Sequence, residues 1–307
     1  QFHMDVAASI QAVTEEIVLK ICRYIKNKYQ INNLCLSGGV ALNCVANGKI
    51  LDQKIFDNIW IQPASGDAGG ALGAALAYYY LELKNIKKNT FDNMQGSLLG
   101  PKFDDNEIKK KLLELDAVFT QSDEQEMIKI VADELVQEKA VGWFQGRMEY
   151  GPRALGSRSI IADPRSEKMQ KNLNLKIKFR ESFRPFAPSV LEENYKDYFN
   201  LKHESPYMLL VSKIKDEIKA ELSSKEKNLF GIDKLNVKRS IIPAVTHVDY
   251  SARIQTVNQS RNGVYYKLIK NFYEKSGCPA LVNTSFNIRG EPIVCSVTDA
   301  FNCFMGT

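Results

Sequence analysis

The chain has 307 residues, with 41 Lys and Arg against 36 Asp and Glu and a formal net charge of +5. This length predicts about two domains, and a content of 44% hydrophobic and 25% charged residues is typical of a globular protein with a sizeable core. A balance this mildly basic allows an anionic substrate but does not require nucleic acid. The sequence contains no run of about 18 apolar residues, so we expect no membrane span.

The positions of cysteine and histidine indicate the redox compartment and limit the possible metal sites. The cysteines lie in apolar segments and form no Cys-x-x-Cys pair, and the three histidines are scattered. This predicts buried free thiols in a reducing compartment rather than disulfides or zinc, and no metal site made of histidine alone. No secretory signal is visible, so we expect a cytoplasmic protein.

The first 83 residues alternate helix and strand. Apolar residues recur at steps of three and four from Val6 to Ile25, which predicts a long amphipathic helix capped by Asp5. A helix of small residues over about 71–83 would pack closely against another element. The remaining predicted elements are strands at 33–36 and 58–61 and a helix at about 40–51. This order predicts an α/β layer.

Residues 84–105 are polar and contain glycine and proline, so we place a linker there. Beyond it, Ser122 would cap a helix over about 123–138, supported by Glu126. Residues 213–240 are rich in Lys and Glu and predict a solvated helix and loop. Strands are predicted at 140–144, 160–162, 187–191, 208–211, 244–247 and 280–282, with helices near 166–176 and 262–275. The second part is therefore mixed α/β.

The segment 147–189 is the most informative part of the chain. Its arginines and lysines stand among glycine, proline and aromatic residues, with Arg153 and Arg158 projecting from one turn and Lys178 and Arg184 added by a second segment. Guanidinium groups on rigid turns suit phosphate, because each fork donates two parallel hydrogen bonds. This predicts a site for more than one phosphate; the alternative is a basic surface loop.

Two glycine-rich turns, at 37–39 and 65–70, follow the first two predicted strands. Glycine lets backbone N–H groups approach an anion at a helix N-terminus, although either turn could be only a tight connection. Asp67 would cap the helix that follows, or else bind a metal. Two such turns after successive strands fit the phosphate loops of an actin-like ATPase lobe.

A polar cradle is predicted downstream, where Ser285, Asn287 and Arg289 follow a strand and Arg253 follows another. Hydroxyls and amides beside arginine suit phosphate or nucleotide, and a polar hairpin loop is the alternative. No Ser-His-Asp or Cys-His nucleophile motif is evident. We therefore expect catalysis by positioning and charge neutralisation rather than through a covalent enzyme intermediate.

Three blocks together carry a family resemblance: GRMEYGPRALG at 146–156, FRPFAP at 183–188 and NTSFN at 283–287. The chain resembles, over nearly its whole length, the O-carbamoyltransferases of the nodulation and antibiotic-tailoring type. The resemblance implies the second lobe of an actin-like (ribonuclease H-like) ATPase domain at 1–95. A mixed α/β YrdC-like domain would follow at 96–307.

The resemblance also implies an activity. The YrdC-like domain would combine carbamoyl phosphate with ATP, in the presence of Mg²⁺, into carbamoyl-adenylate. The actin-like domain would transfer the carbamoyl group to a hydroxyl of a sugar-containing acceptor, with divalent iron or a similar metal. By position, the resemblance implies catalytic roles for Arg153, Lys178 and Arg184, and binding of carbamoyl phosphate and ATP by Arg147, Arg253, Ser285, Asn287 and Arg289. It implies a nucleotide loop at Gly38, Gly39, Asn43, Gly69 and Gly70, and a metal at Asp67.

The sequence departs from that family in one respect. The family's two histidine ligands, in a His-x-x-x-His motif, belong to an N-terminal lobe that is absent here, and we expect both ends to be cut from a longer protein. With Asp67 alone we expect no tightly held metal. We expect the chain to form carbamoyl-adenylate but not to transfer it.

Two other functions stay open. One is a threonylcarbamoyl-adenylate synthase or related tRNA-modifying protein, which would use bicarbonate and threonine. The other is a non-catalytic module that binds double-stranded RNA. The even mixture of charges, without a basic helix or a stripe of stacking aromatic residues, argues against nucleic acid. The acceptor and the oligomeric state are open, a homo-oligomer included.

Overall fold

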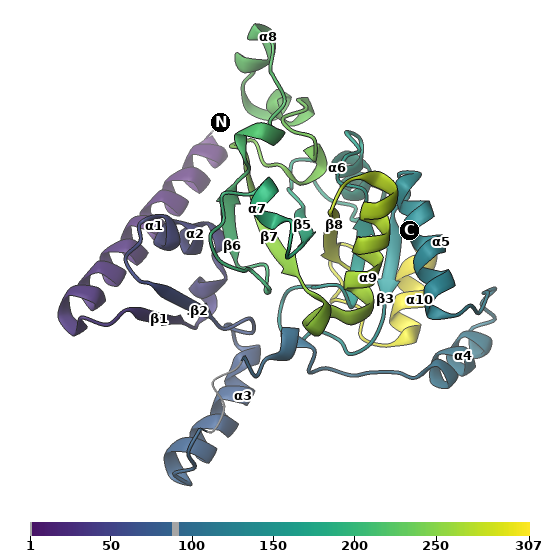
Figure 1. The fold of residues 1–307 in the computed structure, drawn as a ribbon, viewed down its shortest axis with the longest axis horizontal. Helices are drawn as coiled ribbons and strands as arrows, with labels where there is room; N and C mark the ends of the chain where they lie inside the picture. The colour runs from purple at the N-terminus through teal and green to yellow at the C-terminus, as the bar shows by residue number, and fades with distance from the viewer. Residues whose placement is uncertain (1, 88–91) are drawn as a thin grey trace. The chain divides into compact units, whose positions relative to one another are not determined.

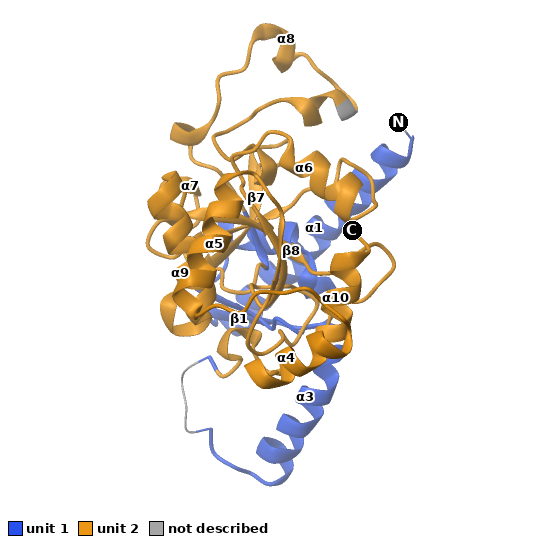
Figure 2. Cartoon of the chain, turned by 90° about the vertical axis from the view of Figure 1, so that its right-hand side faces the viewer, with its two compact units in different colours: residues 1–92, 209–211 blue, residues 93–208, 212–307 orange. Residues whose placement is uncertain are grey.

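The computed structural model describes residues 2–87 and 92–307. These form two compact units (Figures 1 and 2): unit 1 contains residues 1–92 with 209–211, and unit 2 contains residues 93–208 and 212–307. Residues 88–91, which belong to the predicted linker, lie outside the described residues. Both units mix helices and strands, so the predicted α/β class is confirmed.

Unit 1 is built on two parallel strands. Its elements are α1 (Phe2–Tyr29), β1 (Asn33–Leu36), a 3-10 turn η1 (Gly39–Leu42), α2 (Cys44–Asp52), β2 (Asn58–Ile61), α3 (Ala68–Ala77) and a π-helical turn η2 (Tyr78–Glu82). The strands pair in register from Asn33 with Asn58 to Leu36 with Ile61. Cys22, Leu34, Ile50 and Phe56 form the buried core between these strands and the first two helices. The face of α1 that meets this core carries Cys22, with Val18, Leu19 and Ile25 packed beside it. The helix is therefore where the spacing predicted it, but most of the apolar stripe from Val6 to Ile21 is exposed rather than packed on the sheet.

Two details of unit 1 differ from the sequence predictions. Asp5 lies inside the first turn of α1, which begins at Phe2, so Asp5 is not its cap. No residue of α3 is buried among the described parts of the chain, so the expectation of a closely packed helix is wrong over most of its length. The close approach is confined to Gly69, where an added Cβ would lie 2.0 Å from the carbonyl oxygen of Ala64.

Unit 2 is organised by a six-stranded sheet in the order β3-β4-β8-β5-β7-β6, although residues 210 and 211 of β6 are counted with unit 1. The strands are β3 (Val141–Phe144), β4 (Arg158–Ala162), β5 (Ala187–Leu191), β6 (Leu210–Lys213), β7 (Ser251–Val257) and β8 (Ala280–Ser285). The pairs β3–β4, β4–β8 and β8–β5 are antiparallel, whereas β5 and β7 are parallel. Every residue of β4 and β5 is buried, as expected for strands covered on both faces.

Helices cover this sheet (Figure 1). Helix α5 (Glu124–Val136) packs along α9 (Gln259–Ser276), and α10 (Val297–Met305) packs on α4 (Asp105–Glu114) and β3. The shorter helical elements are η3 (Gln95–Ser97), α6 (Met169–Asn172), the π-helical turn η4 (Leu173–Ile177), α7 (Tyr195–Tyr198), η5 (Asp216–Ile218), α8 (Ser224–Lys227), η6 (Gly231–Asn236) and η7 (Pro243–Val245). No helix in the described part of the chain is both long and apolar enough to cross a membrane.

Two predictions for unit 2 are corrected. The cap of α5 is Asp123, whose side chain accepts from the N–H of Glu126 at 2.8 Å, and not Ser122. The strand predicted at 244–247 is instead the 3-10 turn η7, and the strand follows as β7. Proline at the start of η7 cannot donate to a sheet ladder, which favours a turn there. Arg253 therefore lies within β7 rather than after a strand.

The turn that enters β4 requires glycine at position 156. Gly156 has φ +107°, and an added Cβ would lie 2.1 Å from Cδ1 of the fully buried Tyr265. Its carbonyl oxygen accepts from the Trp143 indole at 2.9 Å and from the Gln145 amide at 3.1 Å, so the backbone cannot move away without losing these bonds. Position 156 thus combines an unfavourable backbone conformation with steric overlap.

We predict that Gly156→Ala lowers the free energy of unfolding by at least about 3 kcal/mol, because steric overlap adds to backbone strain. Gly146→Ala is the control, because Gly146 also has positive φ but has open space around its missing Cβ. That variant should lose only about 1 kcal/mol. Urea unfolding measures both, and equal losses would show that Tyr265 does not constrain the turn.

Candidate anion-binding site

Lys178, Ser285 and Asn287 meet at the end of β8. The Lys178 side chain, from the residue after η4, is only 3% exposed. Its ammonium donates to the carbonyl oxygen and to Oδ1 of Asn287, both at 2.9 Å, and also to the carbonyl oxygen of Ser285. The Ser285 hydroxyl lies 3.3 Å from Nζ and donates to Asn287 Oδ1 at 2.6 Å. Three residues of the predicted site are therefore in direct contact.

Lys178 loses its proton near neutral pH. Burial, together with the nearby positive charge of Arg180, lowers the pKa of Lys178 to about 7. The surrounding oxygen atoms act as acceptors for its protons and so favour the ammonium form. No carboxylate pairs with Lys178 in the described residues. A protonated Lys178 is thus a desolvated cation for which an anionic ligand would be the counter-ion.

Glu181 joins two further residues of the predicted site. Its carboxylate accepts from Nε of Arg184 at 3.0 Å and lies 3.7 Å from a terminal nitrogen of Arg289. The two arginines come from distant parts of the sequence, and their side chains are 50% and 65% exposed. The backbone N–H of Glu181 and these guanidinium charges hold the pKa of Glu181 below its usual value. One carboxylate therefore partly compensates the charges of two exposed arginines.

Arg180 was not singled out by the sequence. Its Nε donates to Oδ1 of Asn174 at 2.7 Å, and its guanidinium lies 5.0 Å from the centre of the Phe186 ring. Its charge acts on the pKa of Lys178, so it belongs to the same electrostatic environment. In the sequence, Arg180 lies between Lys178 and Arg184, but its spacing did not distinguish it from a solvated surface cation.

The turn that carries Arg153 is organised around the buried Glu149 carboxylate. Oε1 of Glu149 accepts from the backbone N–H groups of Leu155 at 2.6 Å and Ser157 at 2.8 Å. Burial raises the pKa of Glu149, against the effect of these backbone donors. Arg153 is half-buried on this turn. A buried acceptor thus shapes the loop from within and holds the backbone of the Arg-rich block.

Other arginines of the prediction have different surroundings. Arg158 is 0% exposed and stacks 3.6 Å above the Phe144 ring while donating to the carbonyl of Gln145 at 2.9 Å. The expectation that Arg158 projects from its turn is therefore wrong, because the start of β4 is buried. Arg147 donates to the carbonyl oxygen of Gly100 at 3.1 Å. This hydrogen bond does not involve Lys178 or its partners. Arg253 is half-buried on β7.

Within unit 1, the two glycine-rich turns adjoin. The N–H of Gly38, which has φ +100°, donates to the carbonyl oxygen of Ser65 at 2.8 Å. The turns follow β1 and β2, whose parallel pairing places both carboxyl ends at one edge. Asn43 caps α2 by accepting from the N–H of Ala46 at 3.1 Å. Gly39 and Gly70 have open space around their missing Cβ atoms, unlike Gly69.

Asp67 does not cap the helix that follows it in unit 1. It is exposed and precedes α3, but its side chain makes no capping hydrogen bond, so the capping interpretation is wrong. In the described residues, no group of three or more His, Cys, Asp or Glu side chains could hold a metal ion. A single carboxylate does not make an iron site, so no chemical step is assigned to a metal at Asp67.

Comparison with known proteins identifies the family. Residues 132–307 match the family model described as "Carbamoyltransferase C-terminus", and residues 1–76 match "Carbamoyltransferase N-terminus". The chain belongs to the carbamoyltransferase family. This confirms the resemblance carried by the three sequence blocks.

Related proteins agree with this assignment. An uncharacterized protein of Synechocystis sp., sll1178, is 54% identical over 100% of this chain and 50% of its own length. Nodulation protein NolO of Bradyrhizobium diazoefficiens is 38% identical over 100% of this chain and 53% of its own length. Nodulation protein U of Rhizobium tropici is 32% identical over 93% of this chain and 44% of its own length. The chain thus spans about half the length of the curated relatives it matches.

We predict that sulfate binds unit 2 most tightly below about pH 7 and more weakly as the pH rises, because Lys178 loses its proton above a pKa of about 7. Sulfate itself does not titrate in this range. Calorimetric titration at several pH values, with Lys176→Met as the exposed control and Lys178→Met as the test, measures the effect. An affinity independent of pH in the native chain would remove Lys178 from the site.

The same pKa shift affects stability without ligand. The pKa of Lys178 is about 7 in the folded chain and 10.5 for an ordinary lysine, so between these values the unfolded chain binds more protons. The free energy of unfolding should therefore increase with pH across that window, and Lys178→Met should reduce this increase. Urea unfolding across the window checks the sign.

We predict that Glu181→Gln tightens sulfate binding by about threefold to tenfold, because the carboxylate competes with an added anion for Arg184 and Arg289. Glu124→Gln removes the same charge from a carboxylate paired with Lys267 and should leave the affinity unchanged. If Glu181→Gln instead weakens binding, the carboxylate orients the arginines rather than competing for them.

Proposed function

We propose that unit 2 activates carbamoyl phosphate with ATP and forms carbamoyl-adenylate. In the longer proteins of the family, the carbamoyl group would then pass to a hydroxyl of a sugar-containing acceptor. The observation that carries this proposal is the contact of Lys178 with Ser285 and Asn287, with Arg184 and Arg289 meeting at Glu181. Membership of the carbamoyltransferase family supports the choice of carbamoyl phosphate.

The proposed chemistry has two balanced steps. Water cleaves carbamoyl phosphate into carbamate and inorganic phosphate. A carbamate oxygen then attacks the α-phosphorus of ATP, which forms carbamoyl-adenylate and releases pyrophosphate. Both steps gather negative charge on phosphate oxygens, and catalysis of such reactions relies on positioned cations. Mg²⁺ would enter with the ATP phosphates and neutralise part of their charge.

Each residue of the site has a proposed part in this chemistry. Lys178, held by the loop after β8, would contact a phosphate oxygen from a fixed position, since its side chain is buried. Arg184 and Arg289 are more exposed and would turn from Glu181 to the incoming anion. Arg153, Arg147 and Arg253 are proposed as further phosphate ligands. Ser285 and Asn287 would orient the ammonium and complete the cradle.

The proposal extends to the domain architecture. We infer that residues 1–95 correspond to the second lobe of an actin-like domain and residues 96–307 to a YrdC-like domain. The adjoining turns at Gly38 and Ser65 support a nucleotide loop in the first part. Transfer to the acceptor is proposed for the longer proteins, because the residues described here do not supply a metal site at Asp67.

The test is the formation of an AMP-linked product, detected by mass spectrometry. The chain with ATP and carbamoyl phosphate should form carbamoyl-adenylate, and Arg184→Ala and Arg289→Ala should each lower the rate by about 100-fold, because each removes a donor to developing charge. Lys176→Ala, an exposed cation near the site, should retain the native rate. Unfolding of both arginine variants should be nearly unchanged, since exposed ion pairs contribute little to stability.

Two results would contradict the proposal. Product formed only from bicarbonate and threonine would instead identify a threonylcarbamoyl-adenylate synthase. Salt-dependent binding of double-stranded RNA without any nucleotide turnover would identify a binding module. If the product forms but neither arginine variant slows it, the chemistry is right and the assigned site is wrong.

A further inference from the structure

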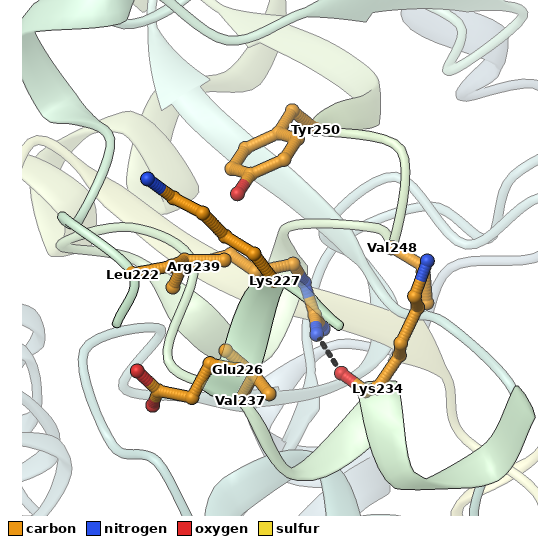
Figure 3. A pocket seen from close by; sticks show the side chains of 8 residues that line it. All are labelled: Leu222, Glu226, Lys227, Lys234, Val237, Arg239, Val248 and Tyr250. Carbon is orange, nitrogen blue, oxygen red and sulfur yellow. Dashed lines mark hydrogen bonds between the residues drawn. The ribbon is translucent and has the colours of Figure 1, made fainter. Parts of the chain in front are cut away.

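We propose that a second pocket in unit 2, separate from the Lys178 site, binds a small organic anion, a phosphate or carboxylate attached to a compact apolar group. The pocket has a volume of about 230 Å³. Its lining residues are Leu222, Glu226, Lys227, Lys234, Val237, Arg239, Val248 and Tyr250 (Figure 3). None of these belongs to the proposed carbamoyl phosphate site, so this inference goes beyond the proposed function.

Arg239 is a buried cation without a paired carboxylate among the residues described, and it lines this pocket. It is only 4% exposed, and its guanidinium donates to the backbone carbonyl of Lys234 (Figure 3) and to that of Thr246. No carboxylate pairs with it anywhere in the described residues, and its Nε has no hydrogen-bond partner there. A buried guanidinium without a counter-ion is unfavourable, because neutral carbonyl dipoles offset only part of its desolvation cost. An anion in the adjoining cavity would supply the missing charge.

The other charged residues of the pocket agree with this sign. Lys227 and Lys234 add two more cations to the lining. The carboxylate of Glu226 is already engaged, because its Oε2 accepts from the hydroxyl of Ser223 at 2.6 Å and from the N–H of Ser223 at 2.9 Å. The lining therefore carries three cations and one carboxylate, and its net charge is positive.

The remaining lining sets the shape of the ligand. Leu222, Val237 and Val248 offer aliphatic surface, and Tyr250 adds an aromatic ring that also carries Lys219 at 5.1 Å from its centre. The volume is below the roughly 300–1,000 Å³ of pockets for drug-sized ligands, so the ligand is fragment-sized. An anionic head near Arg239 with a compact apolar body fits both halves of this lining.

Binding of simple probes tests the pocket. Phenyl phosphate and benzoate supply the two head groups on the same ring, and inorganic sulfate lacks the apolar body. We expect at least one aromatic probe to bind more tightly than sulfate in the Arg184→Ala chain, where the other anion site is weakened. Arg239→Met, which keeps the length and removes the charge, should reduce that affinity by at least about tenfold. Calorimetry or ligand-detected NMR measures each affinity.

The lysines provide a matched comparison that does not depend on the buried arginine. Lys227→Gln should weaken binding by about threefold, whereas Lys225→Gln, in the same short helix but outside the lining, should leave it unchanged. If Arg239→Met fails to fold, the double variant Lys227→Gln, Lys234→Gln decides, with an expected loss of about tenfold.

Three outcomes would overturn the inference. One is that no aromatic probe binds more tightly than sulfate. Another is equal weakening by Lys225→Gln and Lys227→Gln, which would indicate general attraction by surface charge. The third is unchanged affinity in folded Arg239→Met. Adenylate formation is measured separately from probe binding. If Arg184→Ala loses adenylate formation but still binds the probe, the Lys178 site has been impaired and the second pocket has not.

Discussion

The ammonium of Lys178 is buried and, within the part of the chain that the structure describes, hydrogen-bonds only to oxygen atoms of Ser285 and Asn287, at and just after the end of β8. The arrangement of the site in unit 2 depends on this interaction. Those oxygens hydrogen-bond the charge but do not neutralise it, and no carboxylate among the described residues completes the pair. The cation is therefore easily deprotonated and strongly attracted to an anion. Because β8 delivers Ser285 and Asn287 at the same strand end, the position of Lys178 depends on the register of the central strands.

Those central strands are held by polar groups as well as apolar ones. Asn283 on β8 donates to Ser189 on β5 at 3.0 Å and to Gln255 on β7 at 2.9 Å, and all three are fully buried. Gln255 and Asn283 also donate to the carbonyl oxygens of Leu155 and Ala154, at 2.8 and 3.3 Å. Although Oδ1 of Asn283 accepts no hydrogen bond within the described residues, a buried network of this kind favours one register. It thereby ties the Arg153 turn to the strand that ends in the Lys178 cradle.

The arginines of unit 2 divide according to what compensates their charge. Arg158 is compensated by carbonyl oxygens and the Phe144 ring, and Arg165 by Asp163 at 2.6 Å. Arg184 and Arg289 share one carboxylate at the surface, where a ligand can replace it. Arg239 is buried with only carbonyl partners. Arg158 and Arg239 are both buried without a paired carboxylate in the described residues, but Arg158 donates to more carbonyl oxygens and lies on an aromatic ring, whereas Arg239 lines a cavity. Access to a ligand, rather than positive charge itself, therefore separates arginines suited to binding from those that support the fold.

The sequence by itself determined the strands 33–36 and 58–61, the alternation of elements in unit 1 and the family, because periodicity and local motifs encode them. It also placed Lys178, Ser285 and Asn287 in one site through the resemblance. Only the tertiary structure decided that Arg158 is buried, that Asp67 does not cap α3 and that Glu181 lies between Arg184 and Arg289. Burial and pairing of charges depend on which strands and loops meet, and residues distant in sequence meet only after the sheet has formed.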